Sequence, residues 1–438
     1  MEEAEVLELY ELQYSDLMLL SSTITPSSLS LAEEERESLK LICRDVMEAL
    51  GPTGPGLLSI SGVPDASTLR RDLLPLAHRL ALLNPDDRKR ILKEHNLGSD
   101  VPLKNPDRSV SSFAMQLRYA QGPESIQNKP SHRGDTLLNS EQDHLEDGLR
   151  IARICDRAIG GQELEQSLLE SSAAKGRLIH YHSALDNIVL KEAGRSKATV
   201  KRQANVRRDE NISISNKQGL SEGPNLDSNG KEVGSYGLHS NLWQQWHYDY
   251  GIFTVLTAPL FLSPSFPQAT EPKDLFSVFG DEECPSLSDH TYLQIFSPYK
   301  NNVCMVKASP ESFIIQVGES ADILSKGKLR STLHSVSRPA KLGNLSRETF
   351  VVFLQPAWNK TFSIADYPMK RSMSCDQDLQ VSNGETNLAA QDQNKLTQEI
   401  QKILPPLSSR LKDGMTFAEF SCETTKQYYG GSGLQSNR

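Results

Sequence analysis

The sequence has few features of secreted, membrane-spanning or nucleic-acid-binding proteins. Its six cysteines are scattered without a C-x-x-C pair, which argues against a disulfide frame or a thiolate zinc site and predicts reduced thiols. No apolar run approaches the roughly 18–20 residues that a membrane span needs. Lys and Arg number 47 against 56 Asp and Glu, a net charge of −9, whereas nucleic-acid binding needs a cationic surface. The acidic residues 1–5 resemble neither a signal nor a transit peptide, so we expect a cytoplasmic location, with the nucleus as the alternative.

The chain is also poor in hydrophobic residues. Only 37% of its 438 residues are hydrophobic, compared with roughly 45–50% in typical globular chains. The deficit concentrates in polar stretches, at about 186–236, 263–290, 369–395 and in the tail. Such segments bury too little apolar surface to offset the entropy of ordering. We therefore expect one catalytic unit with polar inserts, of which the basic residues 191–208 form a solvated loop; contact with an acidic partner is the alternative.

Helical and β patterns occupy different parts of the chain. Ser30 and Glu33 form a capping box before an apolar face at helical spacing. Further helices are expected after Asp65, after Asn84-Pro85, over about 140–172 and over 396–411, with strand-like stretches at about 9–20, 56–61 and 177–182 and a loop-rich stretch at 96–138. Short apolar runs separated by turn residues follow at 253–257, 292–296, 303–306, 313–317 and 350–354. Many short strands at close intervals indicate a sandwich or barrel.

The segment Trp246-His247-Tyr248-Asp249 opens the β-rich half. Residues two apart on a strand point to the same face, so His247 and Asp249 can offer an imidazole and a carboxylate to one metal ion. A second histidine, His334, lies on a later strand-like run. Singly, each would be an ordinary barrel or surface residue. Together, two histidines and one carboxylate on barrel strands form the facial triad of non-haem Fe(II) oxygenases, which leaves three coordination positions open for a 2-oxo acid and dioxygen.

Arg347 and Thr349 begin the last strand of the β-rich half and share one face of it. A guanidinium binds a carboxylate through two parallel hydrogen bonds, and a hydroxyl two residues on adds a further donor. This pair matches what the remote carboxylate of 2-oxoglutarate requires. A structural salt bridge is the alternative role for Arg347.

With these motifs, residues 242–356 resemble the 2-oxoglutarate- and Fe(II)-dependent oxygenases, specifically the plant-type group related to isopenicillin N synthase. The matching pieces are 246–249 with 254–256, Gly318 with 323–327, 330–336 and 347–349. The N-terminal half also resembles the helical cap of that group, so the resemblance covers roughly residues 8–370. Thr349 replaces the usual Ser, Ile179 replaces the usual Asn before the tyrosine, and the gaps on either side of His334 are longer than usual.

The resemblance implies an α+β fold with a double-stranded β-helix (jelly-roll) core, an N-terminal helical region and a C-terminal helix. It implies Fe(II), 2-oxoglutarate and dioxygen (O2) as cofactor and cosubstrates, with Tyr181 in contact with 2-oxoglutarate; a packing role for Tyr181 is equally open. The expected domains are a cap region at 1–170, the dioxygenase core at 171–370 with the inserts, and a linker, helix and tail at 371–438.

The predicted function is oxidation, by hydroxylation or a related reaction, of a small organic substrate with release of succinate and CO2. No catalytic residues beyond the metal ligands are expected, and the chain is expected to be a monomer that binds neither membrane nor nucleic acid. Two alternatives stay open. One is a non-catalytic or divergent metal-binding β-barrel protein that acts in protein interaction, and the other is a metal protein of another reaction class, such as a hydrolase.

Overall fold

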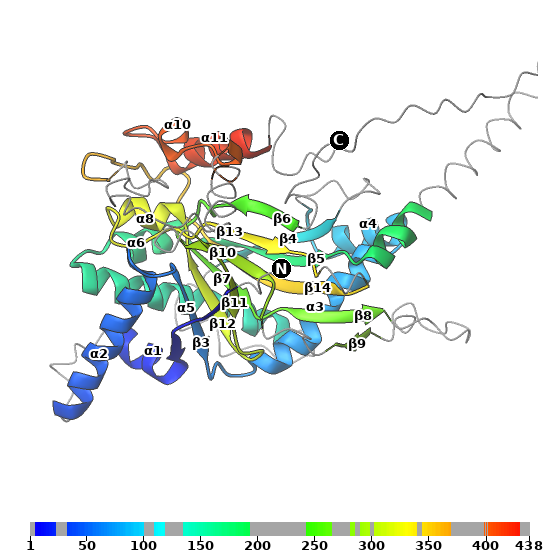
Figure 1. Cartoon of the computed structure of the whole chain (residues 1–438), viewed down its shortest axis with the longest axis horizontal. Coiled ribbons are helices and arrows are strands. Elements are labelled where there is room, and N and C mark those ends of the chain that lie inside the picture. Colours follow the sequence, from blue (N-terminus) through cyan, green and yellow to red (C-terminus); the bar gives the residue numbers. More distant parts are fainter. Residues whose placement is uncertain are drawn as a thin grey trace, which may run out of the picture.

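The computed structural model describes residues 5–22, 33–99, 109–118, 135–192, 242–264, 281–284, 290–297, 302–339, 344–368, 398, 400 and 402–429. Within these residues, helices and strands are mixed up to residue 171 and strands predominate over 173–354; the strands form two β-sheets with helices around them (Figure 1). The predicted α+β class is confirmed. Among the helices described, none is both long and apolar enough to cross a membrane.

The two sheets contain strands from both halves of the chain. The smaller sheet has the order β1 (Glu5–Glu8), β11 (Asn302–Lys307), β10 (Leu293–Ser297), β13 (His334–Ser337) and β6 (Leu242–His247). The larger has the order β2 (Glu11–Gln13), β3 (Leu57–Ser61), β12 (Phe313–Val317), β7 (Phe253–Thr257), β14 (Ser346–Leu354), β5 (Ala173–Tyr181) and β4 (Val110–Arg118). In addition, β8 (Leu260–Pro264) pairs with β14 and with β9 (Asp281–Glu283).

One apolar core lies between the two sheets. The larger sheet contributes Leu57, Ile179, Tyr181, Ile314 and Val351, and the smaller contributes Trp243, Leu293, Ile295, Cys304, Val306 and Val336. These residues alternate along their strands with residues on the opposite face, as the pleat of a strand requires. The sheets therefore pack face to face, and their inner faces enclose the region in which the predicted site residues lie.

Helices cover the outer face of the larger sheet. This layer consists of α1 (Tyr14–Ser21), α2 (Glu33–Leu50), α3 (Ala66–Leu82), α4 (Pro85–Glu94), α5 (Asp135–Ile159) and α6 (Glu163–Ser171). Their apolar faces form one buried cluster with outward-facing residues of the sheet such as Phe350 and Leu354. The start of α4 follows its sequence: the Asn84 side chain accepts hydrogen bonds from the backbone of Asp86 and Asp87, and Pro85 occupies the first turn.

The structure corrects several expectations about local structure. The stretch expected to be a strand at 9–20 contains β2 followed by α1, and the expected loop at 96–138 contains β4. The single helix expected over 396–411 is wrong, because Pro405 and Pro406 interrupt it and the long C-terminal helix is α11 (Phe417–Tyr429). Most of the predicted inserts at 186–236, 263–290 and 369–395 lies outside the described residues, although residues 184–192 are helical.

The C-terminal segment packs against the smaller sheet and against α8 (Glu319–Leu324), with α10 (Leu407–Arg410) and α11 beside α8 (Figure 1). One cluster joins Trp246 and Leu333 to Tyr428, and another joins Ile323 to Phe420. At the contact, the buried Arg410 guanidinium donates to both carboxylate oxygens of Glu319, at 2.8 and 2.6 Å, and to Thr424 at 3.0 Å. A bidentate pair of this kind fixes orientation as well as distance.

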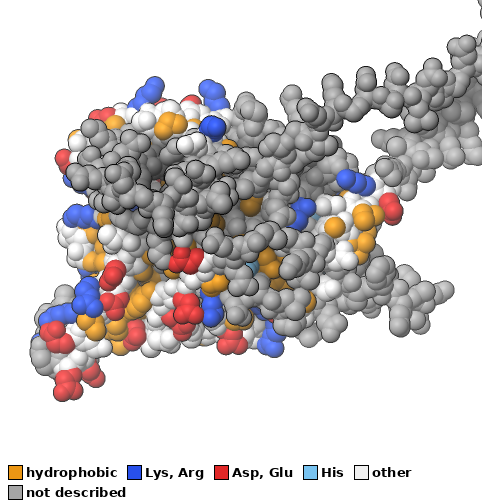
Figure 2. Space-filling model, viewed as in Figure 1, with side chains coloured by type: hydrophobic (Ala, Val, Ile, Leu, Met, Phe, Trp, Pro, Cys, Tyr) orange, Lys and Arg blue, Asp and Glu red, His pale blue; other side chains and the backbone are white. Residues whose placement is uncertain are grey.

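Charges of both signs are mixed on the described surface. On the face shown in Figure 2, acidic and basic side chains alternate along the lower edge rather than gathering into one basic area. This distribution accords with the acidic net charge of the whole chain.

We predict that Arg410→Met lowers the free energy of unfolding by about 3–5 kcal/mol, because the Glu319 carboxylate is then left buried without its partner. Urea denaturation measures the change. Lys307→Met is the control, since the Lys307–Glu8 pair is exposed and exposed pairs contribute little. Equal urea midpoints for Arg410→Met and the wild type would contradict the prediction.

Candidate metal and 2-oxo-acid site

His247, Asp249 and His334 meet at one end of the smaller sheet. His247 is the last residue of β6 and His334 the first of β13, and the two are direct partners across this antiparallel pair. Their ring centroids lie 4.1 Å apart. Asp249 lies two residues beyond the end of β6, so it reaches the site from a turn and not, as expected, from the strand itself. One ligand atom from each of the three residues lies within 4.8 Å of the others.

Hydrogen bonds to the backbone orient both imidazole rings. The Nδ1 atoms of His247 and His334 lie 2.7 and 3.1 Å from the carbonyl oxygens of Gln245 and Thr332, respectively. A carbonyl accepts only, so His247 Nδ1 bears the proton and its Nε2 keeps its lone pair. At His334 the Thr332 carbonyl, which accepts, and the Gln316 amide nitrogen, which donates, both approach Nδ1, at 3.1 and 3.0 Å. The two Nε2 atoms lie 3.8 and 3.9 Å from the carboxylate oxygens of Asp249. Backbone acceptors of this kind prepare histidines to bind a metal through the opposite nitrogen.

Neighbouring residues fix the carboxylate of Asp249. Thr254 donates to its Oδ2 at 2.7 Å, and the Gln316 amide donates to the same atom at 3.0 Å. The Asp249 backbone carbonyl accepts from Glu319 at 2.8 Å. Gly318 makes this close approach feasible, because a Cβ there would overlap the carbonyl of Gly251. The glycine identified in the sequence therefore serves the turn that contains Asp249.

Burial and the adjacent His334 lower the pKa of His247 to about 4. The ring is therefore neutral near pH 7, and metals bind the neutral imidazole. Two imidazoles and one carboxylate are a donor set that suits Fe(II) and other first-row divalent ions. His334 is buried, while His247 and Asp249 are partly exposed, so the group is accessible from one side. The residues present thus fit a bound metal ion.

A β-bulge brings Gln244 to the same site. Across the pairing of β6 with β13, His334 faces His247 but Val336 faces Gln244, so β6 has one extra residue at this point. The bulge resets the alternation of side chains, and the Gln244 amide nitrogen lies 2.9 Å from His247 Nε2. Its amide oxygen accepts from the Tyr181 hydroxyl at 2.8 Å. Gln244 therefore connects the metal ligands to Tyr181.

Arg347 and Tyr181 face each other on neighbouring strands. They are register partners in the antiparallel pairing of β14 with β5, and the guanidinium carbon lies 5.1 Å from the centre of the Tyr181 ring. Burial lowers the pKa of Arg347 and raises that of Tyr181. Arg347 Nε donates to the carbonyl of Thr291 at 3.1 Å. Among the described residues, no carboxylate forms an ion pair with this guanidinium, although burying a charge without such a partner is costly.

Thr349 lies on the same inner face, two residues along β14 from Arg347. Its hydroxyl donates to the backbone carbonyl of Thr257 at 3.3 Å and lies 3.4 Å from the Thr257 hydroxyl. The expected shared face of Arg347 and Thr349 is thus present. Trp243 and Trp246 pack in apolar clusters.

The sequence reasoning missed Gln244 and Gln316, which contact the metal-ligand group directly. Gln316 lies in β12, and its amide nitrogen is 3.0 Å from His334 Nδ1 as well as from Asp249. A signal for Gln316 was present, because it stands two residues before the Gly318 that marks the turn. For Gln244 no such signal existed, since only the bulge places it on the inner face.

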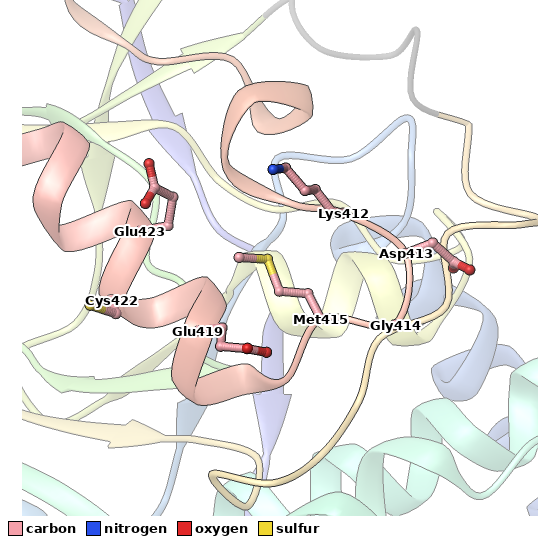
Figure 3. A pocket seen from close by; sticks show the side chains of 7 residues that line it. All are labelled: Lys412, Asp413, Gly414, Met415, Glu419, Cys422 and Glu423. Atoms are coloured by element: carbon pink, nitrogen blue, oxygen red, sulfur yellow. The ribbon is translucent and has the colours of Figure 1, made fainter.

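A surface hollow of about 510 Å³ lies apart from this group, on the C-terminal segment (Figure 3). Its lining consists of Lys412, Asp413, Gly414, Met415, Glu419, Cys422 and Glu423. It includes none of the predicted site residues.

No family model matches the chain, and no curated protein matches it. Among solved structures, it is similar to a full-length Neurospora crassa protein in complex with alpha-KG, at 13% identity over 92% of this chain and 100% of that one, with a TM-score of 0.43. It is also similar to two plant structures. The first is the dioxygenase for auxin oxidation 1 of Arabidopsis thaliana in complex with 2-oxoglutarate, 12% identical over 80% of this chain and 94% of that one. The second is the dioxygenase for auxin oxidation in rice, 15% identical over 89% of this chain and 96% of that one. Both have TM-scores of 0.44.

The similarity to 2-oxoglutarate oxygenases predicted from the sequence is thus found among solved structures as well. The narrower plant-type group stays a prediction. With TM-scores below 0.5 and identities of 15% or less, these likenesses leave the function to be inferred from the site residues themselves.

We predict that the chain binds one divalent ion and that His334→Ala weakens this binding more than about 100-fold, since loss of groups that merely orient metal ligands costs up to that factor. Equilibrium dialysis against Co(II), read together with the visible spectrum of the bound ion, measures the affinity. His95→Ala, at an exposed histidine on the helical side, is the matched control. Equal loss in both variants would show that the ion binds elsewhere.

Proposed function

We propose that the protein is an Fe(II)- and 2-oxoglutarate-dependent dioxygenase that oxidises a small organic substrate. The observation that favours this activity over other metal chemistry is the buried Arg347 guanidinium, which has no carboxylate partner among the described residues. It lies on the inner face of the larger sheet, and Tyr181 and Gln244 connect it to the ligand group by hydrogen bonds and a ring contact. The chemistry of a metal hydrolase does not require a buried guanidinium beside the metal-ligating residues.

Each residue has a defined part in this proposal. His247, Asp249 and His334 would hold Fe(II). Arg347 binds the remote carboxylate of 2-oxoglutarate bidentately, and the hydroxyls of Thr349 and Tyr181 lie on the same inner face. When bound, the metal, the oxo acid and dioxygen supply the oxidative chemistry that yields succinate and CO2. The apolar residues between the sheets exclude water around these groups and strengthen their electrostatic interactions.

The same proposal includes the double-stranded β-helix. The order β5, β14, β7, β12 in one sheet and β6, β13, β10, β11 in the other gives two sets of four strands. Successive strands of the chain cross between the sets at several points, as in a jelly roll. We infer that these eight strands form the catalytic core at 171–370. Residues 1–170 add strands β1 to β4 to the sheet edges and supply the helical layer.

We predict that Arg347→Ala raises the dissociation constant for 2-oxoglutarate more than about 100-fold, since removing one partner of a buried charge pair costs several kcal/mol. Anaerobic titration of the Fe(II)-loaded protein, followed by the charge-transfer absorption of the chelated oxo acid, measures it. Succinate release in air then reports turnover.

Arg347→Lys keeps the charge but not the planar fork, so it should fall between the wild type and Arg347→Ala. Arg153→Ala, whose ion pair with Glu165 lies on the helical side, should bind 2-oxoglutarate like the wild type. If the wild type shows neither the absorption band nor succinate, the dioxygenase proposal fails and a non-catalytic metal-binding protein is favoured.

A further inference from the structure

Five titratable side chains form a second polar cluster, on the opposite face of β5 and β14 from the proposed 2-oxoglutarate site. They are His78, His180, His182, Asp186 and Glu348, and all are at most 2% exposed. The proposed mechanism uses none of them. Because burying so many titratable groups is costly unless they are paired, the arrangement of their contacts is informative.

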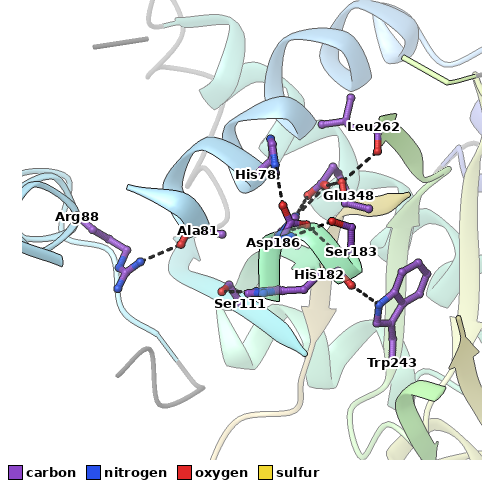
Figure 4. A network of polar contacts seen from close by, with 12 residues as sticks. His78, Ala81, Arg88, Ser111, His182, Ser183, Asp186, Trp243, Leu262 and Glu348 are labelled. Atoms are coloured by element: carbon purple, nitrogen blue, oxygen red, sulfur yellow. Dashed lines mark hydrogen bonds and ion pairs between the residues drawn. The ribbon is translucent and has the colours of Figure 1, made fainter. Parts of the chain in front are cut away.

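His180 lies between two carboxylates. Its Nδ1 is 2.9 Å from both oxygens of Glu348, and its Nε2 is 3.4 Å from Asp186 Oδ2. The other oxygen of Asp186 is 3.3 Å from His78 Nε2 (Figure 4). Three elements of the fold thus meet here: α3 through His78, and the neighbouring strands β5 and β14 of the larger sheet through His180 and Glu348.

Local structure fixes the two carboxylates. Asp186 lies in the first turn of the helix at 184–192; its carboxylate accepts from the Ser183 backbone at 2.7 Å, and the Ser183 hydroxyl accepts from its backbone at 3.1 Å. This reciprocal pair is a capping box. Glu348 accepts a further hydrogen bond from Ser346 at 2.8 Å. These hydrogen bonds hold both carboxylates in place independently of His180.

The surroundings favour a charged His180. Burial alone lowers its pKa, but Glu348 and Asp186 more than offset this, and the net pKa is raised. Burial likewise opposes the charge of Asp186, yet its hydrogen bonds to His180 and His78 lower its pKa. Two further imidazoles among the described residues face His180: those of His78 and His182, with ring centroids 5.1 and 4.5 Å away. His182 Nε2 is 2.9 Å from the Ser111 hydroxyl on β4.

The cluster is not a second metal site. Among the described residues, the group of three or more ligands close enough to share one ion is His247, Asp249 and His334. The His180–Glu348 and His78–Asp186 contacts have hydrogen-bond distances, and the 3.4 Å contact of His180 with Asp186 is an ion-pair contact.

Strand alternation connects this cluster to the opposite face. Glu348 stands between Arg347 and Thr349 on β14, and His180 immediately precedes Tyr181 on β5. The register pairs His180 with Glu348 and Tyr181 with Arg347. Each pair on the outer face therefore has a neighbouring pair on the inner face, one residue further along the same two backbones.

We propose that His180 is a positioning residue for the 2-oxoglutarate site: by bridging Glu348 and Asp186 it fixes β5 against β14 and thereby sets the positions of Tyr181 and Arg347. This inference rests on the proposed function. The property that depends on His180 is the affinity for the remote carboxylate of 2-oxoglutarate. The metal-ligating residues lie on other elements and do not contact the cluster.

Calorimetric titration of the Mn(II)-loaded full-length protein tests the proposal. In His180→Gln, the dissociation constant for 2-oxoglutarate should rise about tenfold or more, because displacements of about 1 Å have effects of up to 100-fold. The affinity for Mn(II) should stay within about twofold, since its three ligands do not contact the cluster. Glu348→Gln keeps an acceptor for His180 and should give a smaller rise; it also serves if His180→Gln fails to fold.

The pH dependence gives a readout that general destabilisation does not. His180 bears its charge below its raised pKa, so the bridge is present there and is lost as the pH rises through that value. Wild-type affinity for 2-oxoglutarate should weaken in this direction, while the affinity of His180→Gln should not show that step. Arg88→Gln is the control: Arg88 is also buried but donates to the carbonyl of Ala81 on the helical side (Figure 4), so it should alter stability and leave 2-oxoglutarate affinity unchanged.

Three results would overturn the proposal. His180→Gln and Glu348→Gln, if folded, could bind 2-oxoglutarate as tightly as the wild type. Affinities for Mn(II) and 2-oxoglutarate could fall by one common factor, which would indicate a structural role alone. Absence of 2-oxoglutarate binding by the Mn(II)-loaded wild type would overturn the proposed function as well, and is distinguishable because it requires no variant.

Discussion

Strand β14 is the element on which most of the structure depends. It pairs with β5, β7 and β8, and nearly all of its residues are buried. A strand buried on both faces must satisfy two environments at once. Its inner side chains include Arg347 and Thr349, whereas its outer side chains include Glu348 and Phe350 and pack toward the helices. The site and the helical layer therefore share one backbone.

The two faces of β14 treat charge in opposite ways. On the outer face, the carboxylate of Glu348 is compensated by His180 and Ser346. On the inner face, Arg347 donates to the Thr291 carbonyl and contacts the Tyr181 ring, and within the described residues no carboxylate forms an ion pair with it. A buried cation without an ion-pair partner is costly. Under the proposed function, the remote carboxylate of 2-oxoglutarate supplies that partner.

The sequence predicted the site where residue type and strand period suffice. His247, His334 and Arg347 stand at strand ends, and an imidazole or guanidinium there has few other roles. Where the backbone departs from a regular period, the sequence predicts less. Asp249 joins the two histidines as predicted but from outside the strand, and Gln244, which was missed, reaches the site through a bulge that no local pattern indicates. The fold shows a different failure: β4 was missed although Phe113, Met115 and Leu117 alternate along it, because this short pattern stands inside a long polar stretch, and its partner β5 lies far along the chain.

The pairing of β5 with β14 also has a consequence for how the chain folds. His180 and Glu348 are 168 residues apart in the sequence, and the C-terminal helix that covers Trp246 comes later still. Contacts of such long range form late and slow the folding of a domain. During synthesis, strand β5 must therefore wait for β14 with its edge unpaired, a period in which strand edges are prone to aggregation. Chaperone contact with the nascent chain would matter most in this interval, before the last third of the protein has left the ribosome.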